Sequence, residues 1–268
     1  MDNNPTGFTL PVEAGDTAIV LNDIHFRSHN KRAMDIIVQF AQDIRPDHTI
    51  LNGDIHDYNA LSKHEKDSKS QVENGALVHE AEASRPYMDA LYESTRKRRV
   101  YGPGNHEDRW IRFVNDNPGL YGLDWHTPLG ASVSRWELLQ QDYEIYAGGL
   151  TIAHGHNLTG SLTKYPAHSV ASNHPRENIL FGHCHRIDRH SETLWSNGVP
   201  HEHTVWTNGH LQDLSQVSYQ KRTKWRYGFS LIRWWESRKK LHFTVDQMEL
   251  FMDGPRMIME GGGKVYRA

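Results

Sequence analysis

The chain has 268 residues with 30 basic and 33 acidic side chains, and its one cysteine is Cys184. The near balance of charge excludes a chain that is basic throughout, as many nucleic-acid-binding domains are, although it leaves room for a local basic groove. One cysteine excludes an internal disulfide bond, so nothing in the composition indicates an oxidising compartment.

Residues 1–7 are polar and lack the basic and then apolar order of a signal peptide. No apolar run approaches the roughly 18 residues that a membrane-spanning helix needs. We therefore expect a cytoplasmic protein that has no membrane-bound segment.

The first elements in chain order are two short strands with a helix between them. Residues 17–21 are an apolar run rich in strand-forming side chains, and residues 48–51 form a second such run. Between them, residues 31–47 carry apolar side chains at three- and four-residue spacing until Pro46 ends the pattern. A strand–helix–strand unit of this kind is typical of an α/β fold.

The middle of the chain is predicted to combine helix with long surface segments. Residues 59–74 are polar and highly charged, and we interpret them as a loop or lid beside a binding site. A helical stretch follows, interrupted near Pro86, with the basic run 96–99 at its end. Residues 115–143 are rich in Gly, Pro and Trp, and we interpret them as an insertion over the site.

The last part of the chain is predicted to consist mainly of strands. The three glycines at residues 261–263 predict a loose tail. Apolar runs indicate three short strands and then a hairpin, at residues 150–153, 178–181, 203–206, and 228–235 with 241–248.

Five short motifs follow the predicted strands. Open α/β sheets bind ligands at the carboxyl ends of their strands, so we expect all five to meet in one site. We therefore predict a single domain over residues 1–268, although the length alone would also allow two. The motifs are Asp23-Ile24-His25, Gly53-Asp54-Ile55-His56-Asp57, Gly104-Asn105-His106-Glu107, His154-Gly155-His156 and Gly182-His183-Cys184-His185.

Carboxylates, imidazoles and one amide are the ligand types that suit a pair of divalent cations. Residues two apart in an extended segment point to the same side, so Asp23 with His25, and likewise the two histidines of the last motif, should each reach one site. Two metal ions about 3.5–4 Å apart would activate a water molecule for attack at phosphorus. We predict two ligand sets that share Asp54: Asp23, His25, Asp54 and His185, and then Asp54, Asn105, His154 and His183.

His106 is not needed as a ligand, and we predict that it protonates the leaving oxygen as a general acid. Asp57 is the predicted partner that orients the His106 imidazole. We assign His156, two residues after a predicted ligand, as a substrate contact. Arg109 is assigned in the same way, with a structural salt bridge as an equal alternative.

The pattern D-x-H, G-D-x-x-D, G-N-H-E, H-G-H and G-H-x-H resembles that of the calcineurin-like metallophosphoesterase superfamily, over roughly residues 17–210. The resemblance implies a four-layer α/β/β/α sandwich of two mixed sheets flanked by helices. It also implies a dinuclear metal centre and hydrolysis of a phosphate ester. The ligand roles and the roles of His106 and Asp57 given above agree with it position by position.

Two departures from the family pattern bear on the substrate. Ser/Thr protein phosphatases of this superfamily carry Gly after the first His and Arg after the second Asp of the second motif, where this chain has Phe26 and Tyr58. The missing Arg argues against a protein phosphatase. Residues 57–62 and 104–109 instead resemble members that phages and prophages often encode. Residues 219–227 interleave four cations with three aromatic rings, which would suit bases and phosphates or form a solvated loop.

We therefore predict a phosphodiesterase that acts on DNA, RNA or a nucleotide. Its cofactors would be two divalent ions, Mn²⁺ first, with Fe, Zn, Ni, Co or Mg as alternatives. A phosphomonoesterase acting on a small molecule or a protein is the first alternative. A catalytically silent binding protein that keeps metals for structure is another, against which the intact ligands and the pair His106 and Asp57 argue. The sequence indicates no protein partner.

Overall fold

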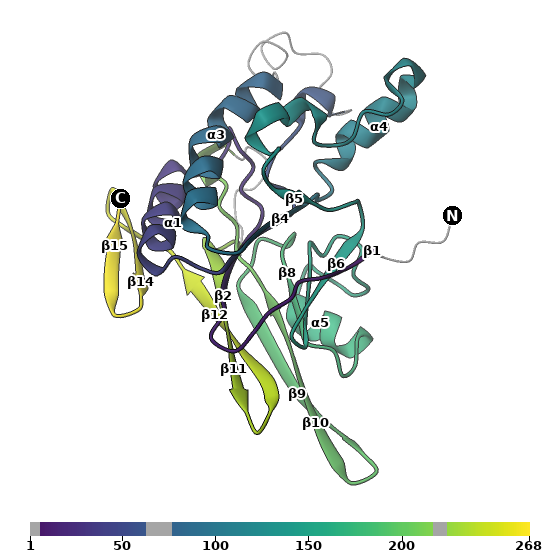
Figure 1. Cartoon of the computed structure of the whole chain (residues 1–268), viewed down its shortest axis with the longest axis vertical. Coiled ribbons are helices and arrows are strands. Elements are labelled where there is room, and N and C mark those ends of the chain that lie inside the picture. The colour runs from purple at the N-terminus through teal and green to yellow at the C-terminus, as the bar shows by residue number, and fades with distance from the viewer. Residues whose placement is uncertain (1–5, 63–76, 217–223) are drawn as a thin grey trace.

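The computed structural model describes residues 6–62, 77–216 and 224–268, and Figure 1 shows their arrangement. Two six-stranded mixed sheets pack against each other with helices on their outer sides, and a three-stranded sheet lies near the C-terminus. The predicted α/β/β/α sandwich is therefore confirmed. Of the predicted lid, residues 63–74 lie outside the described part of the chain, as do residues 219–223 of the basic and aromatic stretch.

The first sheet has the strand order β1-β6-β7-β8-β10-β9. The neighbours β7, β8 and β10 run parallel, whereas β9 and β10 form a long antiparallel ribbon. Its strands are β1 (Thr6–Thr9), β6 (Tyr143–Ala147), β7 (Leu150–Ala153), β8 (Ile179–Phe181), β9 (Asp188–Ser196) and β10 (Val199–Thr207).

The second sheet has the strand order β12-β11-β2-β3-β4-β5. Its strands β2 to β5 are parallel neighbours, and β11 pairs antiparallel with both β2 and β12. Its strands are β2 (Thr17–Leu21), β3 (His48–Asn52), β4 (Arg98–Gly102), β5 (Glu137–Leu138), β11 (Gly228–Ser237) and β12 (Lys240–Glu249).

Four α-helices and several short 3₁₀ turns connect the strands of the described residues. Helix α1 begins at its N-cap Asn30, whose side chain accepts a hydrogen bond from the backbone of Ala33, and it ends before Pro46 as predicted. The helices are α1 (Lys31–Ile44), α3 (Leu77–Ser94), α4 (Asp108–Asp116) and α5 (Pro166–Asn173). The turns are η1 (Asn59–Leu61), η2 (Pro118–Leu120), η3 (Thr127–Ser132) and η4 (Leu214–Gln216), and the small sheet contains β13 (Phe251–Asp253), β14 (Arg256–Gly261) and β15 (Lys264–Arg267).

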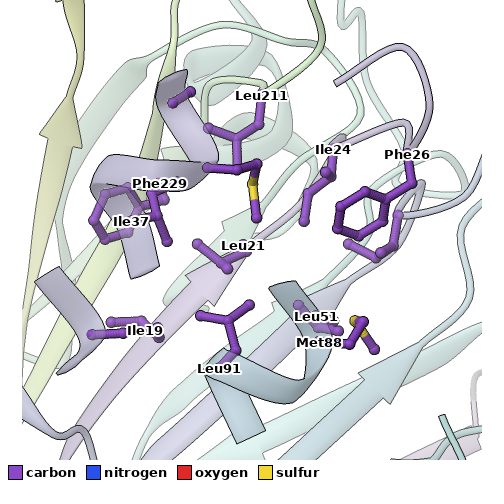
Figure 2. Close-up of a cluster of buried hydrophobic side chains, with 14 of the residues drawn as sticks. Ile19, Leu21, Ile24, Phe26, Ile37, Leu51, Met88, Leu91, Leu211 and Phe229 are labelled. Atoms are coloured by element: carbon purple, nitrogen blue, oxygen red, sulfur yellow. The ribbon is translucent and has the colours of Figure 1, made fainter. Parts of the chain in front are cut away.

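The central strands are buried on both faces, which explains why they appear as continuous apolar runs. On one face, side chains such as Leu21 of β2 and Leu51 of β3 pack against α1 and α3, as Figure 2 shows. On the other face, Val20 and Ile50 pack against Ile152 of the first sheet. A third apolar cluster lies between α5 and the outer side of the first sheet.

Three predictions of local structure were wrong. Helix α3 continues through Pro86, which is exposed, because Met88 and Leu91 on its other side are buried in the core. The basic run 96–99 is not a helix end, since β4 begins at residue 98. The glycines 261–263 do not form a loose tail, because they connect β14 to β15 in a hairpin.

Residues 115–143, predicted as an insertion, include η2, η3 and β5. Both of their tryptophans, Trp125 and Trp136, are buried in the same core as α3, so this segment also forms part of the interior of the protein. Among the described residues, no helix is both long enough and apolar enough to cross a lipid bilayer.

Candidate metal centre

Five loops, each following a different strand, bring the motif side chains to one place. In the second sheet, the parallel neighbours β2, β3 and β4 lead to Asp23, Asp54 and Asn105. In the first sheet, the parallel neighbours β7 and β8 lead to His154 and His183. The carboxyl ends of parallel strands share one edge of a sheet, and here the same edges of both sheets contribute to one site.

The first cluster comprises Asp23, His25 and His185, whose ligand atoms all lie within 4.8 Å of one another. Nε2 of His185 is 3.0 Å from Oδ1 of Asp23, and Nε2 of His25 is 3.9 Å from the same oxygen. All three side chains are buried. They are three of the four residues that we predicted around one metal ion, and the fourth, Asp54, belongs to the adjoining cluster.

The second cluster comprises Asp54, His154 and His183, again with ligand atoms within 4.8 Å of one another. Nε2 of His154 is 3.3 Å from Oδ2 of Asp54 and 3.2 Å from Oδ1 of Asn105. Nδ1–H of His154 donates to the carbonyl of Asn52 at 2.9 Å, which directs the Nε2 lone pair into the cluster. The whole second predicted set is thus together, and the sharing of Asp54 by two ions stays a prediction.

We had expected extended backbone at these positions, and this prediction was wrong. Five predicted ligands have a positive φ: Asp23 (51°), His25 (54°), Asp54 (52°), His183 (62°) and His185 (58°). Asp and His adopt this left-handed conformation more readily than most residues other than glycine. The two pairs of side chains still meet in one site, but tight turns rather than extended segments direct them there.

One carboxylate oxygen holds two imidazoles of the site. Oδ1 of Asp57 accepts hydrogen bonds from Nδ1–H of His106 at 2.9 Å and from Nδ1–H of His25 at 2.6 Å. The first contact is the one that we predicted, and the second was missed, because nothing in the motif spacing links His25 to a residue 32 positions later. Both rings therefore turn Nε2 away from Asp57, and Nε2 of His106 lies 3.8 Å from Oδ2 of Asp54.

The arrangement fits a pair of divalent cations. Nε2 of His25 is buried and has no hydrogen-bond partner within the described ranges, which is the condition of a nitrogen that is ready to bind a metal ion. The clusters combine carboxylate, imidazole and amide donors, which suit Mn, Fe, Zn, Co or Ni.

The aspartates and histidines of the site stabilise one another's charged forms. Burial alone would raise the pKa of Asp23 and Asp54, but the neighbouring imidazoles His185, His106 and His154 outweigh it and lower both pKa values well below the usual range. Burial would likewise lower the pKa of His154, but Asp54 raises it to about 10. The carboxylates are therefore ready as anionic ligands, whereas cations must displace protons from the imidazoles, so metal affinity should rise with pH.

Glu107 fixes the backbone of the second and third motifs. This buried carboxylate accepts hydrogen bonds from four backbone N–H groups, those of Asp54, Ile55, His56 and Gly104, at 2.8–3.1 Å. The hydroxyl of Tyr101 donates to it as well, at 2.8 Å. A structural role for Glu107 is what its place in a turn suggests, and these contacts hold Asp54 in its left-handed conformation.

We expect Glu107→Gln to lower the free energy of unfolding by about 1–3 kcal/mol, because the amide nitrogen cannot accept hydrogen bonds from the backbone donors that now face one carboxylate oxygen. Urea denaturation would measure the change. Glu82→Gln, at an exposed position of α3, is the control and should stay within about 0.5 kcal/mol. Equal stability of the wild type and Glu107→Gln would show that Glu107 does not hold these loops.

Two asparagines that the motifs do not mark hold the first cluster in place. The Asn22 amide donates both to Oδ2 of Asp23 and to the carbonyl of Gly209. The Asn208 amide donates to Oδ1 of Asn22 at 2.7 Å, and its own oxygen accepts from the hydroxyl of Ser230. The only sequence signal for these residues is an amide placed directly after a buried apolar strand.

Two glycines are required where the loops of the two sheets approach. A Cβ atom at Gly53, which has φ of 82°, would overlap the imidazole of His154. A Cβ atom at Gly104 would overlap the carboxylate of Asp54. The glycines of both motifs therefore allow the ligands to approach each other across the junction of the sheets.

The predicted substrate contact His156 lies in a pocket of about 580 Å³ beside the second cluster. Its Nε2 is 3.6 Å from Oδ1 of Asp142 and 3.8 Å from Oδ2 of Asp108, and Arg112 lines the same pocket. Burial, and then the neighbouring His154, lowers the pKa of His156. His156 is thus close to the clusters and can act as a neutral hydrogen-bonding group.

Arg109, the other predicted substrate contact, is engaged with the loop that follows Asp57. Its Nη1 donates to the carbonyl of Asp57 and to Oδ1 of Asn59, both at 2.7 Å. These bonds brace the loop that carries Asp57. A contact between Arg109 and the substrate stays a prediction.

Glu80 of α3 braces the same loop and has an unusual protonation state. It is 2% exposed and accepts hydrogen bonds from the backbone N–H groups of Tyr58 and Asn59 at 2.9 and 3.3 Å. Burial, and then the charge of Asp57, raises the pKa of Glu80 from 4.5 to about 8. Nothing in the sequence distinguished this residue from the surface glutamates of α3.

The raised pKa predicts that the stability contributed by Glu80 falls as pH rises. Between 4.5 and about 8, the folded protein keeps a proton on Glu80 that the unfolded chain releases. The contribution of Glu80 to the free energy of unfolding should therefore decrease through this range by up to about 1.4 kcal/mol per pH unit. Glu80→Gln should remove this contribution, so the free energies of unfolding of the wild type and the variant should diverge with pH, as urea denaturation at a series of pH values would show. An unchanged slope in this variant would contradict the prediction.

Comparison with known proteins agrees with this geometry. A family model of calcineurin-like phosphoesterases matches residues 17–246. The gene 54 protein of Mycobacterium phage L5 is 22% identical over 231 residues, which cover 80% of this chain and 87% of that protein. The gene 54 protein of Mycobacterium phage D29 is 23% identical over the same length, with the same shares.

Two solved structures are similar at low identity. Vacuolar Protein Sorting 29 from Cryptosporidium parvum is 10% identical with a TM-score of 0.42, over 96% of this chain and 97% of that chain. Purple acid phosphatase PPD1 from yellow lupin (Lupinus luteus) seeds is 12% identical with a TM-score of 0.40, over 95% of this chain and 53% of that chain.

The family model spans most of the chain and all five motifs. The motif side chains come together in two clusters of metal-binding type, at the carboxyl ends of strands from both sheets. The chain therefore belongs to the calcineurin-like phosphoesterase family and is a hydrolase of phosphate esters.

Proposed function

We propose that the protein hydrolyses phosphodiester bonds in nucleic acid or a nucleotide, with two divalent cations held by the two predicted ligand sets. The observation that carries the substrate class is an aromatic side chain, Trp225, next to the first cluster. Its ring centroid lies 4.2 Å from that of His185 and 5.3 Å from that of His210. An aromatic ring beside a phosphoesterase centre offers a stacking surface for a base next to the phosphate that is cleaved.

Some side chains next to Trp225 in the basic and aromatic stretch already contact other parts of the protein. Arg226 forms an ion pair with Glu249 at 2.7 Å, and the ring of Tyr227 lies against His210. Lys224 is exposed beside Trp225. Among the described cations of this stretch, Lys224 is therefore the candidate to contact a phosphate next to a base that stacks on Trp225.

The residue after Asp57 supports a substrate other than phosphoprotein. Tyr58 is fully buried, and its hydroxyl donates to the carbonyl of Trp125 at 2.7 Å. This side chain is part of the core and leaves the position without the arginine that protein phosphatases of the family place there. A strand of nucleic acid or a nucleotide has a base that can stack on Trp225, and it does not depend on an arginine at this position.

The chain's own groups would act on the substrate as follows. Bound divalent cations lower the pKa of a water molecule and neutralise charge on the phosphoryl oxygens. Asp57 holds Nδ1–H of His106, so Nε2 of that ring delivers a proton to the leaving oxygen. His156, in the adjoining pocket, donates a hydrogen bond to a non-bridging phosphate oxygen. We propose Mn²⁺ as the first metal to test, since mixed nitrogen and oxygen ligands accept it.

The direct test compares three esters that release the same p-nitrophenolate: p-nitrophenyl phosphate, methyl p-nitrophenyl phosphate and the p-nitrophenyl ester of thymidine 5′-phosphate. The metal-stripped protein would be reloaded with Mn²⁺ before each assay. We expect the highest kcat/KM for the thymidine diester. A preference for the monoester would indicate a phosphomonoesterase, and the absence of metal-dependent turnover of all three would indicate a catalytically silent protein.

Trp225→Ala should lower kcat/KM for the thymidine diester by about 5–150-fold, which corresponds to a stacking energy of about 1–3 kcal/mol, and should spare the methyl diester. Trp235→Ala is the matched control, because Trp235 also lies against a histidine, His242, but in the β11–β12 hairpin. Equal losses on both diesters would assign Trp225 to the support of His185 rather than to base stacking.

A further inference from the structure

A second group of metal-binding side chains lies outside the candidate metal centre, under helix α5. It comprises His168 of α5 with His190 and Glu192 of β9, whose ligand atoms all lie within 4.8 Å of one another. Nε2 of His190 is 2.7 Å from Oε1 of Glu192. The ring centroids of the two histidines are 4.6 Å apart. Nothing in the phosphoesterase motifs accounts for this group.

The strand register adds a fourth side chain on the same face. His190 and Glu192 alternate along β9, so they point to one side of the sheet. His203 of β10 lies directly opposite Glu192, and Val205 lies directly opposite His190. Val205 packs in the apolar cluster beneath α5, which identifies this face of the ribbon as the one that α5 covers.

His203 is the observation that points to a ligand. Its side chain is fully buried, and neither ring nitrogen has a hydrogen-bond partner among the described residues. Nε2 of His203 is 3.9 Å from Oε2 of Glu192, so this nitrogen faces a member of the group. A neutral imidazole always carries one N–H and one lone pair, and burying both without a partner is destabilising.

We propose that His168, His190, Glu192 and His203 form a structural site for one borderline divalent cation, Zn²⁺ in the first place. Three imidazoles and one carboxylate are a donor set that suits tetrahedral zinc. Metal–ligand distances of about 2.0–2.2 Å place tetrahedral ligands about 3.3 Å apart. The ligand atoms of His168, His190 and Glu192 already lie within 4.8 Å of one another, and Glu192 faces His190 with one oxygen and His203 with the other, at 2.7 and 3.9 Å. Binding of the ion would draw His203 toward the other three ligands.

The surface around the group gives an ion access to it. A recess of about 410 Å³ is lined by Tyr165, His168, Asp188, Arg189 and His190. The cation enters from this side, while His203 contributes from the buried side. All four ligands come from the protein, which is typical of a structural rather than a catalytic zinc site.

Such an ion would join three elements beside the candidate metal centre. Helix α5 has only eight residues, fewer than an isolated helix needs to be stable, so it depends on what holds it to the sheet. The loop that carries His183 and His185 connects β8 to β9, the strand that provides two of the four ligands. The site therefore stabilises the position of α5 over β9 and β10 and supports the loop from outside.

The test is the number of zinc ions bound per chain, measured by equilibrium dialysis and elemental analysis on the full-length protein. The double variant His190→Gln with Glu192→Gln should bind one ion fewer than the wild type. Zn²⁺ should raise the Tm of the wild type by more than that of the variant. The Mn²⁺-loaded variant should keep phosphoesterase activity within about twofold, because no predicted catalytic group changes.

Two further variants make the comparison sharp. His203→Gln should also bind one ion fewer. If this variant does not fold, the double variant alone decides the question, because His190 and Glu192 are each about 30% exposed and their replacement should be tolerated. His242→Gln, which removes a histidine from β12, is the control and should bind as many ions as the wild type. Equal zinc content in the wild type and the double variant would overturn the proposal. Because the result is a difference, it does not depend on how many ions the candidate metal centre holds.

Discussion

Replacing His106 with alanine should lower kcat by about 10²–10⁴-fold for a phosphodiester with a poor leaving group. Asp57 holds Nδ1 of His106 at 2.9 Å, so Nε2 is the end of the ring that donates the proton to the leaving oxygen. Metal content should stay at the wild-type value, because His106 belongs to neither predicted ligand set. Steady-state kinetics together with elemental analysis of the same samples would measure both quantities.

The dependence on the leaving group separates general-acid catalysis from a structural role of His106. p-Nitrophenolate needs little protonation, so the loss of kcat should be much smaller for a p-nitrophenyl ester than for an alkyl ester. His126→Ala is the control, since His126 also lies next to an aspartate, Asp124 at 3.6 Å, but away from the clusters. A loss below twofold, or an equal loss on both esters, would rule out the acid role.

Asp54→Asn should remove bound metal as well as activity. In the wild type, the backbone N–H of His106 donates to Oδ1 of Asp54 at 2.9 Å. The side-chain oxygen of asparagine can accept the same hydrogen bond, so the loop that carries His106 should keep its conformation. The variant loses the negative charge that two cations would share. We expect kcat/KM to fall by more than the roughly 10–100-fold that follows loss of a partner behind a metal ligand.

Metal analysis decides whether Asp54 is the shared ligand. Asp54→Asn should retain less metal than the wild type after dialysis against a common Mn²⁺ concentration, and extra Mn²⁺ should restore part of the activity. Asp246→Asn is the control, because Asp246 pairs with Arg233 on the exposed face of the β11–β12 hairpin. Full occupancy in Asp54→Asn would refute the shared role.

The site residues that could be predicted were those that directly follow a recognisable apolar strand in the sequence. Asp23, Asp54 and His183 each lie two positions after the last residue of a buried strand, so the strand and the ligand are recognised together. The contact between His25 and Asp57 could not be predicted, because it depends on how two loops from neighbouring strands turn toward each other. The same holds for Asn208, whose bond to Asn22 joins residues 186 positions apart.

The fold was predictable where burial makes a strand apolar and not where a strand is half polar. Strands β2 and β3 are buried along their whole length and appear in the sequence as apolar runs. Strand β9 carries polar and charged side chains on both faces, and the sequence gives no alternation of apolar residues to mark it. Its partner β10 was predicted only in its buried half, residues 203–206.

The two sheets contribute unequal numbers of predicted ligands, and each predicted ion would have ligands from both sheets. Asp23, His25, Asp54 and Asn105 come from the second sheet, while His154, His183 and His185 come from the first. The thickness of the apolar layer between the sheets, where Ile50 meets Ile152, therefore sets the gap that every ion must span. Removing a single methylene from that layer would therefore alter the spacing of the predicted pair of ions without changing any ligand, because close-packed interiors transmit strain.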